Sequence, residues 1–157
     1  EDGEWKTHFS EIVYPNDPVP DLDLDDISRE RLSAMPRTER WLELDLVHMP
    51  APIADRDPPW FPLAIVAADQ EGIVSPGDML SPLEDDLYER ALTSTVSVLT
   101  ERPACPATVR LREGPYAELV GPLLEEVGVR CEVLEELSGI KEFMDATEEH
   151  FRQRGSY

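Results

Sequence analysis

The strongest structural signal in the sequence is an uninterrupted apolar run at residues 63–68, LAIVAA. A run of this length has no polar face, which is typical of a strand covered on both sides of its sheet. The following residues 69–72 (DQEG) are typical of a tight turn, and the apolar pair Ile73 and Val74 opens the next strand. We therefore expect an antiparallel hairpin over residues 63–80, in a sheet with helices on its faces.

Residues 41–49 (WLELDLVHM) alternate in polarity and predict an earlier strand. Successive side chains of a strand face opposite sides, so the leucines would share one face and the residues between them the other (Leu42, Leu44 and Leu46 against Glu43, Asp45 and Val47). The simplest interpretation of Glu43 and Asp45 is that they lie on the solvent-facing side of the sheet. Five prolines within residues 50–62 predict a loop after this strand.

Helix and strand signals alternate through the second half of the chain. Residues 81–84 (SPLE) have the pattern of a capping box with proline at the first helical position, which predicts a helix to about Thr100. The later predicted elements are a strand at 108–111, a helix at 114–128, a strand at 130–134 and a helix capped by Ser138 that ends near Gly155. A short helix at 28–35 precedes the first strand. The predicted fold class is α/β with a mixed (α+β) sheet, in which a three-stranded antiparallel start is followed by α-β-α-β-α.

This order of elements resembles the ribonuclease H-like superfamily over residues 40–152, and its integrase and transposase branch in particular. Trp41 and Asp45 resemble the tryptophan and aspartate that those domains often carry on the first strand. Residues 63–72 resemble their second strand, which ends in an aspartate before a glycine-containing turn. The pattern also resembles an uncharacterised bacterial domain family. The resemblance implies a ribonuclease H-like topology with a degenerate motif.

For function, the resemblance implies a metal-dependent phosphoryl-transfer site. Such a site needs three or four converging carboxylates around Mg²⁺ or Mn²⁺. The best available set in this chain is Asp45, Glu113 and, on the last predicted helix, Glu142 or Asp145. Residues 112–115 (REGP) fall where the family has a strand ending in an aspartate, and the cationic Arg112 cannot take the metal-ligand role there.

The charge of the chain limits its partners, because 34 acidic and 14 basic side chains give a formal net charge of −20. Nucleic-acid binding draws on Lys and Arg, so this charge argues against nucleic acid as a partner. Ten of the acidic residues lie within residues 1–30. We expect residues 1–36 to form an acidic, proline-containing arm with a short helix, and residues 37–157 to form one domain. No apolar run is long enough to span a membrane, and we expect a bacterial cytoplasmic protein.

Aromatic residues outside the predicted helices and strands are the candidates for binding a partner. Trp60 and Phe61 stand among the prolines of the 50–62 loop, and Trp5 lies in the acidic arm. Aromatic side chains held among prolines form a rigid apolar projection suited to a pocket on another protein. The alternative is that they fold back and cover the core.

The sequence favours a non-catalytic protein-interaction or regulatory domain that needs no cofactor and binds another protein or a second copy of itself. The basic stretch would anchor the acidic arm of the same chain or of a neighbour, and the second case gives an arm-exchanged homodimer (Arg102, Arg110 and Arg112). One alternative is a metal-dependent nuclease-like enzyme, which predicts several carboxylates with raised or coupled pKa values in one cleft. A second alternative is an acidic mimic of nucleic acid.

Overall fold

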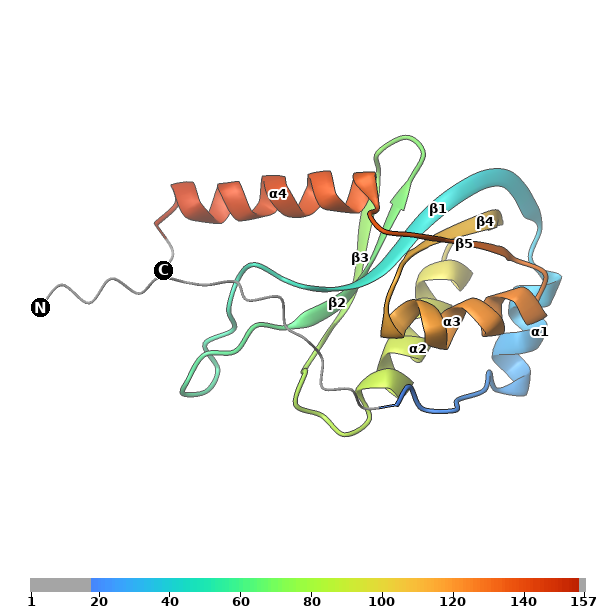
Figure 1. The fold of residues 1–157 in the computed structure, drawn as a ribbon, viewed down its shortest axis with the longest axis horizontal. Helices are drawn as coiled ribbons and strands as arrows, with labels where there is room; N and C mark the ends of the chain where they lie inside the picture. The colour runs from blue at the N-terminus through green and yellow to red at the C-terminus, as the bar shows by residue number, and fades with distance from the viewer. Residues whose placement is uncertain (1–17, 156–157) are drawn as a thin grey trace, which may run out of the picture.

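The computed structural model describes residues 18–155, which form one five-stranded sheet with four helices around it (Figure 1). The elements follow one another along the chain as α1 (Asp26–Ala34), β1 (Arg37–His48), β2 (Leu63–Asp69), β3 (Val74–Leu80), α2 (Leu87–Thr100), β4 (Cys105–Arg112), α3 (Pro115–Glu126), β5 (Arg130–Leu134) and α4 (Ser138–Gln153). The predicted α/β class and order of elements are confirmed.

The strands lie in the order β3-β2-β1-β4-β5. β1, β2 and β3 pair antiparallel, whereas β4 pairs parallel with both β1 and β5. The parallel pairs need crossover connections, which α2 and the following turn provide between β3 and β4, and α3 provides between β4 and β5. β1 is therefore the central strand of the sheet.

Helices cover the two faces of the sheet unequally. α1, α2 and α3 lie on one face, and α4 lies alone on the other (Figure 1). The leucines of β1 point toward α1–α3 and join the larger core cluster, while Val47 joins a smaller cluster with Leu137 and Ile140 at the start of α4. The predicted alternation of β1 is thus confirmed.

The apolar run at residues 63–68 forms the centre of β2 and is buried throughout. Leu63, Ile65 and Ala67 contribute to the cluster under α1–α3, and the alternate residues Ala64, Val66 and Ala68 contribute to the cluster under α4. Burial on both faces explains why this strand has no polar side, as the sequence predicts.

The capping-box prediction at residues 81–84 is wrong. The backbone forms turns over this stretch, and α2 begins at Leu87. Ser81 is buried at the end of β3, and its hydroxyl accepts hydrogen bonds from the Arg56 guanidinium (3.3 Å) and from the Leu83 backbone N–H (3.4 Å). The serine therefore holds a turn against the loop before β2 instead of starting a helix.

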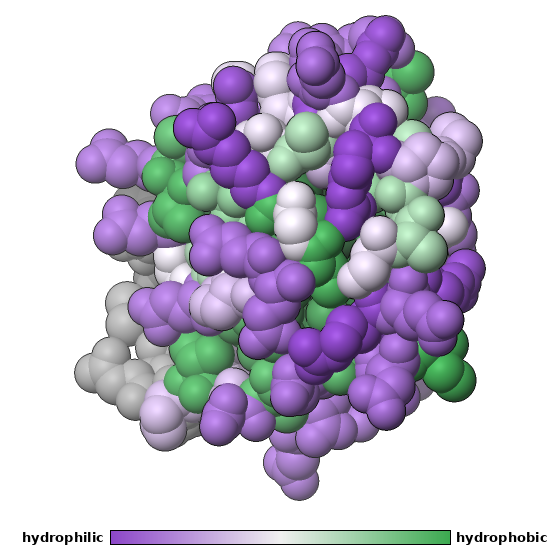
Figure 2. Space-filling model, turned by 90° about the vertical axis from the view of Figure 1, so that its right-hand side faces the viewer, coloured by the Kyte–Doolittle hydropathy of each residue, from purple (hydrophilic) through white to green (hydrophobic). Residues whose placement is uncertain are grey.

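The chain before the sheet is partly embedded in the core. Leu24 and Leu32 are buried in the cluster that contains the leucines of β1. The predicted boundary at residue 36 stays a prediction, and residues 1–17 of the predicted arm lie outside the described residues. In the view of Figure 2, hydrophilic side chains cover most of the surface and apolar ones show in small separate areas. Within residues 18–155, none of the helices is long and apolar enough to cross a membrane.

Candidate functional site

The position that corresponds by resemblance to a metal site holds an ion pair between neighbouring strands. Asp45 lies in β1 and Arg112 at the end of the parallel strand β4. The Arg112 Nε–H donates to Asp45 Oδ2 at 2.7 Å. The Asp45 side chain is only 6% exposed, whereas half of the Arg112 side chain is accessible. A hydrogen bond between two ionised groups at this distance is short and strong.

Burial and pairing act on Asp45 in opposite directions. Burial raises the pKa of the Asp45 carboxyl above 3.8, while the hydrogen bond and the charge of Arg112 lower it; the net direction is upward. Asp45 and Arg112 line a cavity of about 320 Å³ together with Val47 of β1 and with residues of α4 and the segment just before it (Glu136, Leu137, Ile140, Lys141 and Met144). One carboxylate in this cleft has a raised pKa, and a guanidinium neutralises its charge.

The second acid of β1, Glu43, is also buried, with 1% of its surface exposed. Its carboxylate accepts the backbone N–H groups of Gly139 (3.3 Å) and Ile140 (2.9 Å) at the start of α4. The positive end of the helix dipole adds to this attraction. A Cβ atom at residue 139 would lie 2.8 Å from Glu43 Oε2, so glycine gives the carboxylate room to approach.

Two sequence predictions fail at this point. Glu43 and Asp45 are buried beside α4 and do not face solvent. Ser138 does not cap α4, because the cap residue is Leu137 and the helix N–H groups are satisfied by Glu43. The capping carboxylate comes from a residue 97 positions earlier than Ile140, so no local sequence signal could show it.

The remaining predicted metal ligands lie on the surface. Glu113 follows β4 and is exposed, and its backbone N–H donates to the carbonyl of Leu134 at 2.8 Å. Glu142 and Asp145 are exposed on α4, and Asp145 pairs with Lys141 at 3.1 Å. Across residues 18–155, no three His, Cys, Asp or Glu side chains come close enough together to hold a metal ion. The structure therefore brings Asp45 to Arg112, and it does not gather the predicted carboxylates around one point.

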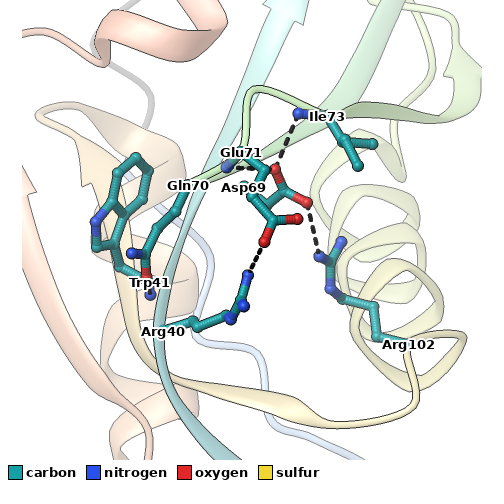
Figure 3. A network of polar contacts seen from close by, with 7 residues as sticks. All are labelled: Arg40, Trp41, Asp69, Gln70, Glu71, Ile73 and Arg102. Carbon is teal, nitrogen blue, oxygen red and sulfur yellow. Dashed lines mark hydrogen bonds and ion pairs between the residues drawn. The ribbon is translucent and has the colours of Figure 1, made fainter.

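The aspartate at the end of β2 organises a turn (Figure 3). Asp69 Oδ1 accepts the backbone N–H groups of Glu71 and Ile73, both at 2.9 Å. Asp69 Oδ2 lies 3.8 Å from the guanidinium of Arg102, which follows α2. The adjacent Gln70 accepts the Trp41 backbone N–H at 2.8 Å and so ties the turn to β1. Asp69 thus has a structural role in the turn that the sequence predicts.

The proline-rich loop that contains Trp60 folds back on itself. Ile53 and Trp60 form an isolated antiparallel bridge, and the Trp60 indole N–H donates to Asp55 at 2.7 Å. The Arg56 guanidinium lies 4.3 Å from the centre of the Trp60 ring, which is half-buried. Phe61 is 37% exposed beside it. Trp5, the third predicted partner-binding residue, lies outside the described residues.

One part of the sheet has no helix over it, and the sequence did not lead us to predict this open area. α4 packs on β1, β2 and β3 and runs away from β5 (Figure 1), which leaves the β4–β5 half of that face without a helix. On this area the Arg110 guanidinium lies 4.1 Å from the centre of the Trp41 ring and pairs with Glu132 at 3.3 Å. The alternation of Arg110 and Arg112 along β4 is the sequence signal that could have shown it, because residues two apart share a face.

A family model described as a domain of unknown function (DUF6930) matches residues 28–148. The chain belongs to this family. The family description assigns no activity to its DUF6930 members. No curated protein matches the sequence.

Solved structures similar to this DUF6930 chain include the HTLV-2 integrase catalytic core domain in complex with magnesium. Its dimeric form is 9% identical over 71% of this chain and 67% of the other, with a TM-score of 0.49. Its trimeric form is 9% identical over 70% of this chain and 66% of the other, with a TM-score of 0.50. At this identity the likeness concerns the fold, and this DUF6930 domain has the ribonuclease H-like fold predicted from the order of its elements.

We expect Glu43→Ala to lower the free energy of unfolding by about 2–4 kcal/mol, because one buried and one partly buried N–H group at the start of α4 lose their acceptor. Hydrogen exchange should accelerate in α4 more than in α2. Glu43→Gln, which keeps one acceptor oxygen, should lie between the wild type and Glu43→Ala. The matched control is Glu142→Ala, since that residue is exposed on the same helix. Equal effects of the Glu43→Ala and Glu142→Ala substitutions would contradict this role.

We expect the pKa of Asp45 to exceed 3.8 and to rise further in Arg112→Gln, because the hydrogen bond and the charge of Arg112 lower it. The folded chain then holds this proton more tightly than the unfolded chain. The contribution of Asp45 to stability is therefore complete below pH 3.8 and falls as the pH rises through the folded pKa. Carbon-13 NMR titration of the carboxyl measures this pKa, with Asp45→Asn giving the assignment.

The control for this titration is Arg110→Gln, because Arg110 lies two residues away on β4 but pairs with Glu132. It should leave the pKa of Asp45 unchanged. A pKa at or below 3.8 in the wild type, or the same value in Arg112→Gln, would show that the balance between burial and pairing is wrong.

Proposed function

We propose that this chain is a non-catalytic interaction domain built on a ribonuclease H-like scaffold. The observation that carries the proposal is the 2.7 Å hydrogen bond between Arg112 and the buried carboxylate of Asp45. The acid that resembles a first metal ligand is committed to a cation of its own chain. The chain keeps the ribonuclease H-like fold, but the two buried acids of β1, Glu43 and Asp45, join this strand to α4 and β4.

Electrostatics supports this proposal. Two divalent cations in a phosphoryl-transfer site are balanced by several carboxylates. Here the guanidinium of Arg112 occupies the side of Asp45 from which a metal ion would be shared with β4, and like charges repel strongly in a partly buried cleft. Glu43, the other buried acid of β1, is bonded to the N-terminus of α4.

The open area of the sheet is the surface that we assign to a partner. It consists of the outward side chains of β1, β4 and β5 that lie beyond α4, together with Arg112, which borders it at the cleft (Trp41, Arg110, Arg112, Arg130, Glu132 and Leu134). Three of these side chains are cationic on a chain with a net charge of −20. Trp41 and Arg110 are stacked, so an apolar surface lies next to positive charge. Such a surface suits an acidic segment that carries apolar side chains.

The N-terminal segment 1–17 has this chemistry. It contains five acidic residues and one lysine, together with Trp5 and Phe9. We propose that it occupies the open area, either within its own chain or in an exchange between two copies. The exchanged arrangement would be a closed, symmetric dimer.

A metal-dependent nuclease is the second candidate, favoured by the fold and by an aspartate on the first strand. Manganese titration by calorimetry separates it from the first. We expect the wild type to bind Mn²⁺ no more tightly than about 1 mM. Arg112→Asp should bind more tightly, because it removes the cation and adds a carboxylate beside Asp45. A micromolar site in the wild type that is lost in Asp45→Asn, with cleavage of DNA or RNA, would overturn the proposal.

The partner surface is tested in the full chain by exchanging charge on it. We expect Arg110→Glu to increase the hydrogen exchange of residues 1–17, because an acidic segment would no longer be attracted to β4. Arg154→Glu is the matched control, since it makes the same charge change at the exposed end of α4. Sedimentation then distinguishes a monomer, in which the segment binds its own chain, from a dimer, in which two copies exchange segments. Identical hydrogen-exchange rates of residues 1–17 in the wild type, Arg110→Glu and Arg154→Glu would exclude this occupant.

A further inference from the structure

A second cavity lies between β3 and the C-terminal half of α2, away from the cleft at Asp45. It encloses about 380 Å³. Its walls are four consecutive residues of β3 and five residues at the end of α2 and just beyond it (Ser75, Pro76, Gly77 and Asp78; Ser94, Ser97, Val98, Glu101 and Arg102). Hydroxyl groups, one guanidinium and two carboxylates therefore surround one space.

The serines of this cavity differ from the threonines of the same helix. Thr93, Thr95 and Thr100 each donate a hydrogen bond to the carbonyl four residues earlier, at 2.8–3.0 Å. Ser94 and Ser97 make no such bond to the helix backbone within the described part of the chain. Ser94 is nevertheless 96% buried, with 4% exposed. The Ser94 residue is buried, but it borders the cavity, where its hydroxyl is able to bind water or a ligand.

The backbone of β3 is shaped to leave this space open. The register of β3 against β2 shifts between the pairs Ala64–Met79 and Val66–Pro76, which places a bulge at residues 77–78. A Cβ atom at Gly77 would lie 2.7 Å from the Ser94 hydroxyl oxygen. Glycine therefore keeps the Ser94 hydroxyl accessible from the cavity. Bulges of this kind are frequent beside binding sites, because they redirect a strand edge.

The guanidinium of Arg102 forms only a long ion pair with another residue of the described chain. Its guanidinium lies 3.8 Å from Asp69, which is beyond hydrogen-bond distance, and the Asp69 carboxylate is held by the turn N–H groups (Figure 3). The side chain of Arg102 is about a quarter exposed. Asp69 thus positions the guanidinium, whose remaining N–H groups are able to bind an anion. Asp78 and Glu101 are exposed at the cavity and are able to bind a cation.

We propose that this cavity binds a small zwitterion of the free amino-acid class. The ligand carboxylate would bind Arg102 and the serine hydroxyls, and its ammonium group would bind Asp78 or Glu101. A ligand with only an anionic group would meet two uncompensated carboxylates, and one with only a cationic group would meet Arg102. This inference uses different residues from the proposed partner surface and does not depend on it.

The test measures the binding of glycine, L-serine and L-glutamine to the full chain. Saturation-transfer NMR and thermal shift detect the binding, at ligand concentrations of up to about 10 mM. We expect at least one to bind, and to bind more tightly than its hydroxy-acid and decarboxylated analogues. Arg102→Gln and Ser94→Ala should each weaken binding about tenfold or more, because each removes a hydrogen bond to the ligand.

Two controls keep the result interpretable. Thr93→Ala, on the exposed side of α2, should bind as the wild type does, because its hydroxyl is bonded within the helix. Arg112→Gln should also leave this binding unchanged, which separates the inference from the proposed function. Absence of binding by all three amino acids to a folded wild type would overturn the inference. Equal binding of the analogues that lack the amine or the carboxylate would overturn it as well.

Discussion

The structure depends on the neutralisation of two buried carboxylates that β1 carries on the face beside α4. Glu43 accepts the N–H groups of Gly139 and Ile140, and Asp45 accepts a hydrogen bond from Arg112. Buried charges are tolerated in proteins only when they are paired in this way. Since β1 is the central strand, these two contacts fix α4 and the end of β4 to the middle of the sheet.

This arrangement changes what the scaffold can do. The ribonuclease H-like topology places first-strand acids beside the end of a parallel strand and the last helix, which is a geometry suited to a shared metal ion. In this chain the same closeness is used for internal pairing. The two sites that we propose lie on other surfaces: the open area over β4 and β5, where Arg110 stacks on Trp41, and the serine-lined cavity between β3 and α2.

Local sequence patterns predicted most elements well and failed where a distant residue decides the outcome. The run at 63–68, the turn at Asp69 and the strand Arg130–Leu134 follow from short-range polarity and turn chemistry. The helix start at Ser81 was wrong, and so was the capping role of Ser138, although α4 does begin at Ser138. At the first, Arg56 and a turn use the serine hydroxyl; at the second, Glu43 supplies the cap from another strand. Capping signals are weak compared with tertiary contacts that satisfy the same N–H groups.

The sequence by itself determined the α/β class, the order of the elements and the presence of a cation where the resemblance has an aspartate. Periodicity and turn residues report local preference, and these were sufficient for that purpose. Only the tertiary structure decided that Glu43 and Asp45 are buried, that Arg112 pairs with Asp45, and that Ser94, Gly77 and Arg102 meet at one cavity. The physical reason is that burial and pairing depend on neighbours far apart in the chain, and the polarity of a residue does not specify which group will lie against it.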